Sequence, residues 1–271
     1  MTTSLADVIA VLEALYPPDT AQSWDRVGLV TGDPEQPVTR ILLAVDPTLA
    51  VIDEARVLGA ELLLTHHPLL MRGVHSVAVT RAKGASITNL ILGDIALYVA
   101  HTNADVAERG VSAALASACG ILDPQPLQIA EGQPLGRIGD LAEATTLGAF
   151  AQRVAQALPA APVGIRVSGP PEAPVQRIAV LGGAGDDLFD AVRAGGADVY
   201  VTADLRHHPA LEAREEARGG SPYLIDAGHW ASESLWLAEV AADLATALGD
   251  GVEIVTSAIC TDPWSFVITP G

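Results

Sequence analysis

The hydrophobic pattern alternates between short apolar runs and stretches with helical periodicity. Three runs read as buried strands because they are rich in Leu, Ile and Val and end at turn residues: "RILLAVD" (Arg40–Asp46), "ELLLTHHP" and "DIALYVAHTNAD". Helices are predicted between and after them, over "PTLAVIDEARVLGA", residues 80–92 and residues 111–119. An amphipathic helix begins the chain, with Ser4 as its N-cap. Strands and helices that alternate in this way predict an α/β fold with largely parallel sheets.

The second half of the chain repeats the order of the first. A helix in "TLGAFAQRVAQAL" and a strand in "VGIRVSG" precede the segments "RIAVLGG", "DVYVTADLRHHPAL" and "PYLIDAGHWASE". In each half, an HHP tripeptide follows the second strand of the repeat. After the third strand, each half has a His followed four residues later by an acidic residue. This agreement predicts an internal duplication that gives two similar α/β lobes. Because open α/β sheets bind ligands at the carboxyl ends of their strands, we expect a metal site in the cleft between the lobes.

The stretch "GILDPQPLQIAEGQPLGRIGDL" interrupts the pattern with prolines and glycines, and we interpret it as the connection between the halves. The predicted first lobe is therefore 1–123, with the HHP and HTNAD motifs. The predicted second lobe is 124–271, with the GGAG, HHP and GHWASE motifs and a final strand in "VEIVTSAI".

Composition narrows the function classes. The 271 residues carry a formal net charge of −18, which disfavours extended nucleic acid as a partner. No uninterrupted apolar run reaches the length of a membrane span, and the N-terminal segment lacks the basic start of a signal peptide, so we expect a cytoplasmic protein without a membrane partner. Cys119 and Cys260 lie far apart in apolar surroundings and are predicted to be reduced thiols in the core.

Two adjacent histidines, His66 and His67, end the strand in "LLLTHHPLL". Neighbouring side chains of an extended chain point in opposite directions. Pro68 also keeps His67 out of helical geometry, so the two imidazoles can splay and each can meet a different metal ion. Taken alone, such a pair is more often one hydrogen-bonded core histidine beside an exposed one.

Two further motifs supply carboxylates. "HTNAD" places His101 and Asp105 four residues apart, and "GHWASE" does the same for His229 and Glu233. On a helical turn this spacing puts both side chains on one face, where imidazole and carboxylate can bind Zn, Mn, Fe, Co or Ni. Each pair alone also fits a surface ion pair. However, all three motifs follow predicted strands in an otherwise apolar chain, which favours one shared site.

The number of donors favours two ions. Five or six nitrogen and oxygen ligands exceed a tetrahedral zinc site and suit two divalent metal ions that share a carboxylate and a water. The predicted metal ligands are His66, His67, Asp105, His229 and Glu233. Either Glu233 or Asp105 would bridge. The two carboxylates would only partly neutralise two divalent cations. The remaining positive charge would lower the pKa of the bridging water and make metal-bound hydroxide available. His101 is predicted to be catalytic, orienting water or shuttling a proton.

Weaker signals leave alternatives open. "LGGAGDD" (Leu181–Asp187) is either a close-packing turn or a loop that faces a phosphate. His207 and His208 of the second HHP either contact substrate or lie in a solvated loop, and Trp24 and Asp25 either line the cleft or pack a turn. No Ser–His–Asp or Cys–His arrangement stands out.

Together these motifs resemble a known family, the dinuclear-metal-centre hexamers or NGG-interacting-factor-three-like proteins, often labelled GTP cyclohydrolase I type 2 homologs. The matching segments run in family order: "WDRVGLVTGDP", "LLLTHHPLL", "VAHTNAD", "PLGRIGDL", "VLGGAGDD", "ADVYVTADLRHHPAL" and "DAGHWASE". The resemblance implies two α/β lobes, two metal ions on the five predicted ligands, and a homo-oligomer in the form of a toroidal hexamer. Its cyclohydrolase label implies attack of metal-activated water on a purine nucleotide, although the sequence shows no guanine reader.

The leading hypothesis is a dinuclear metal-dependent hydrolase that uses metal-bound hydroxide, with a nucleotide as the candidate small-molecule substrate. The alternatives are a non-catalytic metal-binding protein, such as a metallochaperone or storage module, and a ring-shaped scaffold. An exchangeable metal-binding tail would favour a chaperone, and the sequence has none.

Overall fold

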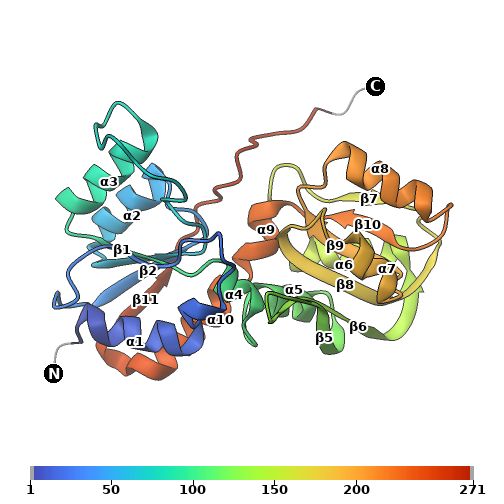
Figure 1. The fold of residues 1–271 in the computed structure, drawn as a ribbon, viewed down its shortest axis with the longest axis horizontal. Coiled ribbons are helices and arrows are strands. Elements are labelled where there is room, and N and C mark those ends of the chain that lie inside the picture. The colour runs from blue at the N-terminus through green and yellow to red at the C-terminus, as the bar shows by residue number, and fades with distance from the viewer. Residues whose placement is uncertain (1–2, 269–271) are drawn as a thin grey trace. The chain divides into compact units, whose positions relative to one another are not determined.

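The computed structural model describes residues 3–268 of the chain, which form two units of dense internal contact. The first unit contains residues 3–107 and Leu237–Thr261, and the second contains Glu108–Trp236 and residues 262–268. Each unit is built on its own sheet (Figure 1). The chain is therefore an α/β protein with two sheets, as the alternating pattern predicts.

The first sheet has five strands in the order β1 (Gly28–Thr31), β4 (Ala96–Val99), β3 (Leu62–Thr65), β2 (Arg40–Ala44) and β11 (Glu253–Thr256). All neighbours are parallel except β1, which runs antiparallel to β4 at the edge. The central strands β2, β3 and β4 are almost wholly buried, which explains their continuous apolar runs.

Helices cover both faces of the first sheet. Figure 1 shows α2 (Leu49–Leu58) and α3 (Ala82–Leu92) on one face, and α1 (Leu5–Leu15) and α10 (Trp236–Leu248) on the other. Alternate strand residues supply the two cores, since Leu42, Leu63 and Leu97 pack with the α2–α3 side. Ser4 caps α1 as predicted, in a reciprocal capping box with Asp7. This unit also has two short 3₁₀ helices: η1 (Pro18–Thr20) lies between α1 and β1, and η2 (Gly249–Gly251) lies between α10 and β11.

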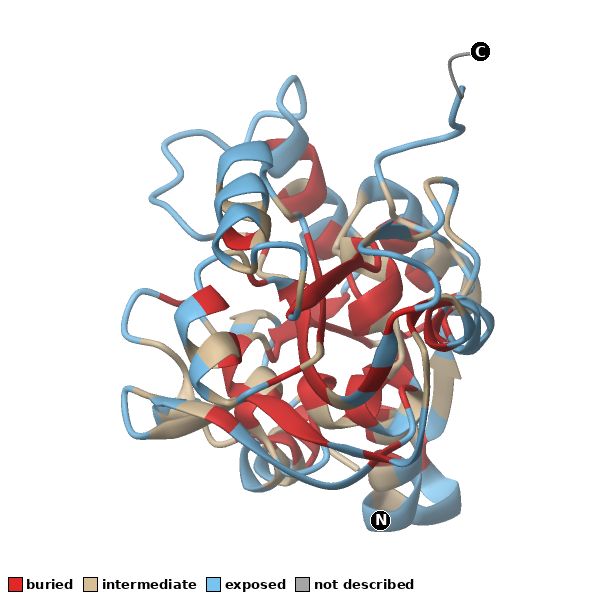
Figure 2. Cartoon of the chain, turned by 90° about the vertical axis from the view of Figure 1, so that its right-hand side faces the viewer, coloured by how far each residue is buried: buried red, intermediate tan, exposed pale blue. Residues whose placement is uncertain are grey.

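The second sheet has six strands in the order β5 (Ile121–Ala130), β6 (Gln133–Thr146), β8 (Pro174–Ala184), β9 (Val199–Ala203), β10 (Tyr223–Asp226) and β7 (Arg166–Ser168). Among the residues that the structure describes, only β8–β9 and β9–β10 are parallel pairs in this sheet. One core packs α5 (Val111–Ala118) and α6 (Leu147–Ala157) against this sheet, and another packs α7 (Phe189–Ala194) and α8 (His207–Glu216). The buried residues accordingly follow the strands and the inner faces of the helices (Figure 2).

The two units share a chain order, which supports the predicted duplication. In the first, β1 precedes the parallel series β2–β3–β4 and pairs with β4. In the second, β7 precedes the parallel series β8–β9–β10 and pairs with β10. A short helix follows the third strand in each case, α4 (Thr102–Val106) after β4 and α9 (His229–Ser234) after β10. The polar motifs thus occupy equivalent places in the repeat.

The Pro-rich stretch after residue 119 is not a mere connection between halves, and this interpretation was wrong. It forms the antiparallel hairpin β5–β6. Pro124 and Pro126 fit there because β5 is an edge strand, where a missing backbone N–H breaks no internal ladder. Glu131 and Gly132 make the turn, both with positive φ (48° and 82°).

The end of the chain returns to the first sheet. Strand β11 pairs in parallel with β2, and the residues of α10 from Leu237 onward belong to the first unit. The predicted lobe boundary between residues 123 and 124 falls inside β5. In the structure, the chain passes from one unit to the other after Ala107, Trp236 and Thr261. As a statement about domains, the division into 1–123 and 124–271 stays a prediction.

Both cysteines are free, but only Cys119 is buried. The prediction of a core position for Cys260 was wrong, because the chain is no longer part of the sheet after β11. Within residues 3–268, no helix combines the length and apolar character needed to cross a membrane.

Candidate metal centre

His66 and His67 lie in the turn that follows β3, and backbone hydrogen bonds fix both. The His66 N–H donates to the Ala44 carbonyl (3.2 Å) and the His67 N–H donates to the Val45 carbonyl (2.8 Å). The His66 ring is fully buried, and its Nδ1 donates to the Ala100 carbonyl at 2.9 Å. Because a carbonyl oxygen only accepts, Nδ1 carries the proton and Nε2 keeps its lone pair.

His67 is oriented by a carboxylate instead. Its Nδ1 lies 2.7 Å from Asp46 Oδ1, and the Thr261 hydroxyl donates to the other oxygen of Asp46. Asp46 follows β2, the strand next to β3, so the parallel register brings it beside the His67 turn. An ionised Asp46 selects the Nδ1–H tautomer of His67 and leaves its Nε2 as the ligand atom.

His101 follows β4 and is the residue before α4. Its Nδ1 is 2.9 Å from Asp25 Oδ1, while the second Asp25 oxygen accepts from the Thr102 N–H (3.0 Å) and hydroxyl (2.6 Å). Burial raises the pKa of Asp25, but the hydrogen bonds from His101 and Thr102 outweigh it and hold that pKa well below its usual range. Asp25 is therefore an anion that fixes the His101 ring.

The first unit brings these three imidazoles together. His66, His67 and His101 can each offer one ligand atom, and these atoms lie within 4.8 Å of one another. Asp105, on α4, places Oδ1 3.6 Å from His66 Nε2. The first unit thus has a group of nitrogen donors that could bind a metal, with a carboxylate beside it. The structure adds His101 to the possible ligands, and its predicted catalytic role is not tested by this geometry.

The second unit contains His229 and Glu233 on α9. His229 Nε2 is 3.0 Å from Glu233 Oε1, and its Nδ1 is 2.9 Å from Asp204 Oδ2. Burial lowers the pKa of His229, but the Asp204 and Glu233 carboxylates outweigh it and raise that pKa to about 11. Asp204 comes directly after β9, as Asp46 comes shortly after β2, so a strand-end carboxylate orients a histidine in both units.

Gly183, near the end of β8, makes room for this pair. A Cβ at this position would lie 2.3 Å from Glu233 Oε1 and 3.4 Å from His229 Nε2, and the backbone has φ of +71°. Its N–H donates to the Ser232 hydroxyl on α9 (3.0 Å), and its carbonyl accepts from the Thr202 hydroxyl (2.9 Å). The glycine-rich segment is thus a close-packing turn whose backbone groups are used within the fold.

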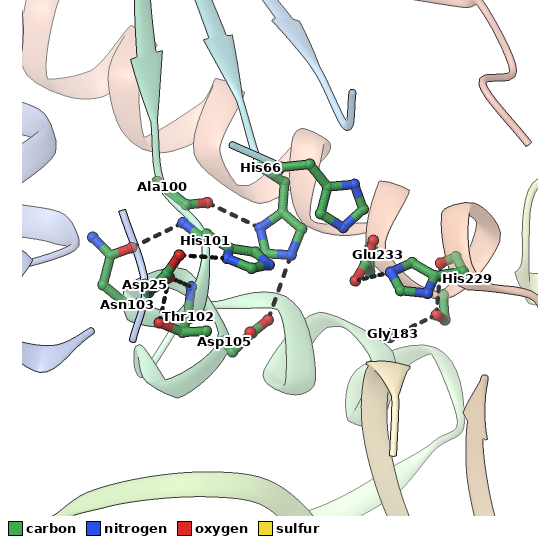
Figure 3. Close-up of polar contacts among 12 residues, drawn as sticks. Asp25, His66, Ala100, His101, Thr102, Asn103, Asp105, Gly183, His229 and Glu233 are labelled. Atoms are coloured by element: carbon green, nitrogen blue, oxygen red, sulfur yellow. Dashed lines mark hydrogen bonds and ion pairs between the residues drawn. The ribbon is translucent and has the colours of Figure 1, made fainter. Parts of the chain in front are cut away.

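The four histidines share one pattern of hydrogen bonding, which Figure 3 shows for His66 and His101. His66, His67, His101 and His229 each direct Nδ1 to an oxygen atom, one to a backbone carbonyl and three to Asp carboxylates. Metal-binding histidines characteristically donate their second ring nitrogen to such a partner, which fixes the tautomer and raises the basicity of the ligand nitrogen. The residues present therefore fit a metal.

Sequence reasoning found the histidines but missed part of their support. Asp46 was not singled out, although its position at the end of "RILLAVD" was the available signal. Asp25 and Asp204 were noted without this role. His207 and His208 are exposed at the start of α8 with ring centroids 5.2 Å apart, and neither joins a donor group in the described part of the chain.

The fold and the donor groups define a class: a two-sheet α/β protein with histidine and carboxylate groups that could bind metal. Comparison with known proteins gives the family. Residues 3–263 match the model of Duf34/NIF3 (NGG1p interacting factor 3), and the chain belongs to this family.

Individual relatives agree with this assignment. A protein of Streptomyces coelicolor called "GTP cyclohydrolase 1 type 2 homolog" is 48% identical over 270 residues, covering 96% of this chain and 93% of its own. A Clostridium perfringens protein of the same name is 33% identical over 97% of this chain and 99% of its own. The crystal structure of a Bacillus cereus protein related to NIF3 superposes with a TM-score of 0.90 at 27% identity, covering 98% of this chain and all of that one (100%).

Proposed function

We propose that this chain is a metal-dependent hydrolase that holds two divalent ions with His66, His67, Asp105, His229 and Glu233. The shared orientation of the imidazoles is the observation that carries the proposal. Every one of the four rings directs Nδ1 to an oxygen acceptor, so Nε2 is the nitrogen that would face a metal ion. In His66 and His229, Nε2 already lies beside a carboxylate of the proposed ligand set, Asp105 and Glu233 respectively. Three of these acceptors are Asp carboxylates, of which Asp25 is buried, Asp46 is partly buried and Asp204 is exposed.

The donors come from both units, and their use in one centre is part of the proposal. The first unit would contribute His66, His67 and Asp105, and the second would contribute His229 and Glu233. Glu233 would hold metal beside His229, since its side chain is only 4% exposed and one of its oxygens faces His229 Nε2; it is our first candidate for a carboxylate shared by both ions. Asp105 is the alternative.

When bound, two divalent ions would supply Lewis acidity and bring the pKa of a shared water toward neutrality. The protein's own residues would orient the ligands, move protons and keep space in the site. Asp25, Asp46 and Asp204 hold the imidazoles in one tautomer and orientation. His101, anchored by Asp25, would orient water or move a proton through Nε2. Gly183 keeps the space beside Glu233 clear of a side chain.

A nucleotide is the first substrate class to test, because curated relatives are named GTP cyclohydrolase 1 type 2 homologs. We further propose a homo-oligomer, in the form of a toroidal hexamer, and the cytoplasm as the compartment. The family resemblance supports the oligomer, and two unpaired cysteines are consistent with a reducing compartment. Size-exclusion chromatography with light scattering tests the hexamer, and a species smaller than a dimer of this chain would contradict any oligomer.

The central experiment compares wild type with Glu233→Ala and with Glu212→Ala, an exposed acid on α8 of the same unit that serves as a matched control. Metal per chain is measured after saturation with Zn²⁺, Mn²⁺ or Fe²⁺, and GTP, other nucleotides and phosphoesters are screened for hydrolysis. We expect metal-dependent turnover in wild type and Glu212→Ala, and loss of both metal and turnover in Glu233→Ala.

The other outcomes are equally informative. Turnover that persists after chelation and dialysis would contradict the hydrolytic proposal. Inert wild-type protein that transfers its metal readily to an apo-acceptor would favour the metallochaperone. Inert protein that binds no metal would favour a scaffold.

A further inference from the structure

The second unit has a cavity of about 340 Å³ that lies apart from the donor groups. It is bounded by β7, β10 and α8, which are neighbours in Figure 1. Its lining residues are Arg166, Ser168, Leu205, His207, Ala210, Leu211, Arg214, Leu224 and Asp226. The volume lies at the lower end of the roughly 300–1,000 Å³ typical of small-molecule sites. None of the lining residues is among the predicted metal ligands.

The walls combine an apolar surface with two guanidinium groups. Leu205, Leu211 and Leu224, with Ala210, supply the apolar part. A pocket that is mainly apolar with a few placed polar groups is the usual form of a site for a small organic molecule. The two arginines are notable because the chain has a formal net charge of −18, so a local excess of positive charge is unexpected.

Arg214 is held in place before any ligand binds. Its Nη1 donates to the carbonyls of Gly220 (2.8 Å) and Pro222, and its guanidinium carbon lies 5.1 Å from the centre of the Tyr223 ring. Among the described residues, no hydrogen bond or ion pair involves its Nε or Nη2. A rigid guanidinium with donors to spare is suited to a planar oxyanion.

The charge balance of the cavity selects the kind of anion. Arg166 is paired with Asp226, whose carboxylate also accepts from the Leu205 N–H (3.2 Å). No carboxylate of the lining is left for Arg214, so the two arginines and Asp226 together carry one positive charge. A monoanion neutralises it, whereas a phosphate dianion would leave a negative charge beside Asp226, which is 8% exposed.

We propose that this cavity binds a small organic monocarboxylate, with its carboxylate on Arg214 and its apolar or aromatic body against the leucines. The site is independent of the proposed hydrolase activity, because no metal ligand lines it. It nonetheless adjoins the metal donors in sequence, since Leu205 follows Asp204, the partner of His229. An occupant would therefore contact the segment that orients His229.

The test uses 3-phenylpropionate as the probe and the full chain, both metal-loaded and chelator-treated. Ligand-observed NMR titration gives Kd for this carboxylate, for 3-phenylpropionamide and for phenyl phosphate. We expect the carboxylate to bind at least about tenfold more tightly than either of the others, since a charge-assisted hydrogen bond contributes about that much. Metal loading should leave this ranking unchanged, whatever the outcome for hydrolysis.

Two sets of variants locate the site. Arg214→Gln should weaken binding of 3-phenylpropionate at least about tenfold, while Arg56→Gln, which changes an exposed arginine on α2, should leave it unchanged. Arg214 also supports the Gly220–Pro222 turn, so the matched pair Leu211→Glu and Leu211→Gln provides a second test at a residue that is 48% exposed. The glutamate should weaken binding of the carboxylate at least about tenfold relative to the glutamine, because only the glutamate adds a like charge at the rim.

Equal affinity for the carboxylate and the amide, or tighter binding of phenyl phosphate, would overturn the proposal. So would equal affinity of Leu211→Glu and Leu211→Gln for the carboxylate, whether or not Arg214→Gln folds.

Discussion

Replacement of Gly183 by alanine is the sharpest single perturbation of the second unit's donor pair. A Cβ at this position would lie 2.3 Å from Glu233 Oε1 and 3.3 Å from its Cδ, with His229 Nε2 at 3.4 Å. Because hydrogen bonds to Ser232 and Thr202 hold the Gly183 backbone, the Glu233 carboxylate is the group that must move. Gly183→Ala is therefore expected to displace Glu233 from the position in which it faces His229.

Two costs contribute, and the chain offers a control that separates them. Alanine at a positive φ costs about 1–2 kcal/mol, and overpacking adds roughly 1–3 kcal/mol, so Gly183→Ala should lower the free energy of unfolding by roughly 2–5 kcal/mol. Gly196 has nearly the same φ (+66° against +71°), but a Cβ there would meet nothing within 4 Å. Gly196→Ala should therefore show the backbone cost alone.

Urea unfolding of metal-free protein measures the stability of both variants, and calorimetric titration measures their metal affinity. Gly183→Ala should also bind metal about 10–100-fold more weakly than wild type, as expected when the support of a ligand is disturbed. Gly196→Ala should retain wild-type affinity. Equal losses of stability in the two variants, with unchanged metal affinity in Gly183→Ala, would refute the account of this glycine.

Three further outcomes follow from the polar contacts. Asp25→Asn should lower the free energy of unfolding by about 1–3 kcal/mol at neutral pH; because the pKa of Asp25 is depressed in the folded state, the difference from wild type should shrink as the pH falls below about 4, and a constant difference would contradict the role of this charge. His229 has a pKa raised to about 11 in the metal-free protein, so its stabilising contribution is complete below about pH 6.5 and is lost as the pH rises toward 11. His229→Gln should therefore lower the free energy of unfolding more at pH 6 than at pH 10, roughly the two sides of that window. Metal uptake near pH 7 should also release a proton from His229, which calorimetry in buffers of different ionisation enthalpy detects. Asp204→Asn should weaken metal binding about 10–100-fold while the exposed Asp187→Asn does not, and equal affinities would argue against orientation of His229 by Asp204.

The parallel core of each unit was predictable from the sequence because its signals are local. Strands buried on both faces of a sheet are continuous apolar runs, and "RILLA", "LLLT" and "ALYV" are too short for typical helices. The repeated HHP and His–carboxylate motifs also revealed the shared order of the two units. His66, His67 and His101, which the structure places together in the first unit, drew attention in the sequence because polar residues at the ends of such strands are conspicuous.

What could not be predicted depends on pairing across long sequence distances. Strand β11 joins β2 from 213 residues away, as the Arg40–Glu253 contact shows, and no local feature of "VEIVT" specifies that partner. The β5–β6 hairpin was hidden by Pro124 and Pro126, which an edge strand tolerates. Asp25 reaches His101 from a loop 76 positions earlier, so its role depends on tertiary structure.

The number of metal ions per chain tests the central claim most directly. Wild type, His66→Ala and Glu233→Ala should be saturated with Zn²⁺, freed of loosely bound metal, and analysed by elemental analysis against protein concentration. The account predicts two ions per wild-type chain and a lower content in each variant, because the proposal assigns ligands from both units to one pair of ions. One ion or fewer in fully loaded wild type, or two ions retained in either variant, would contradict it.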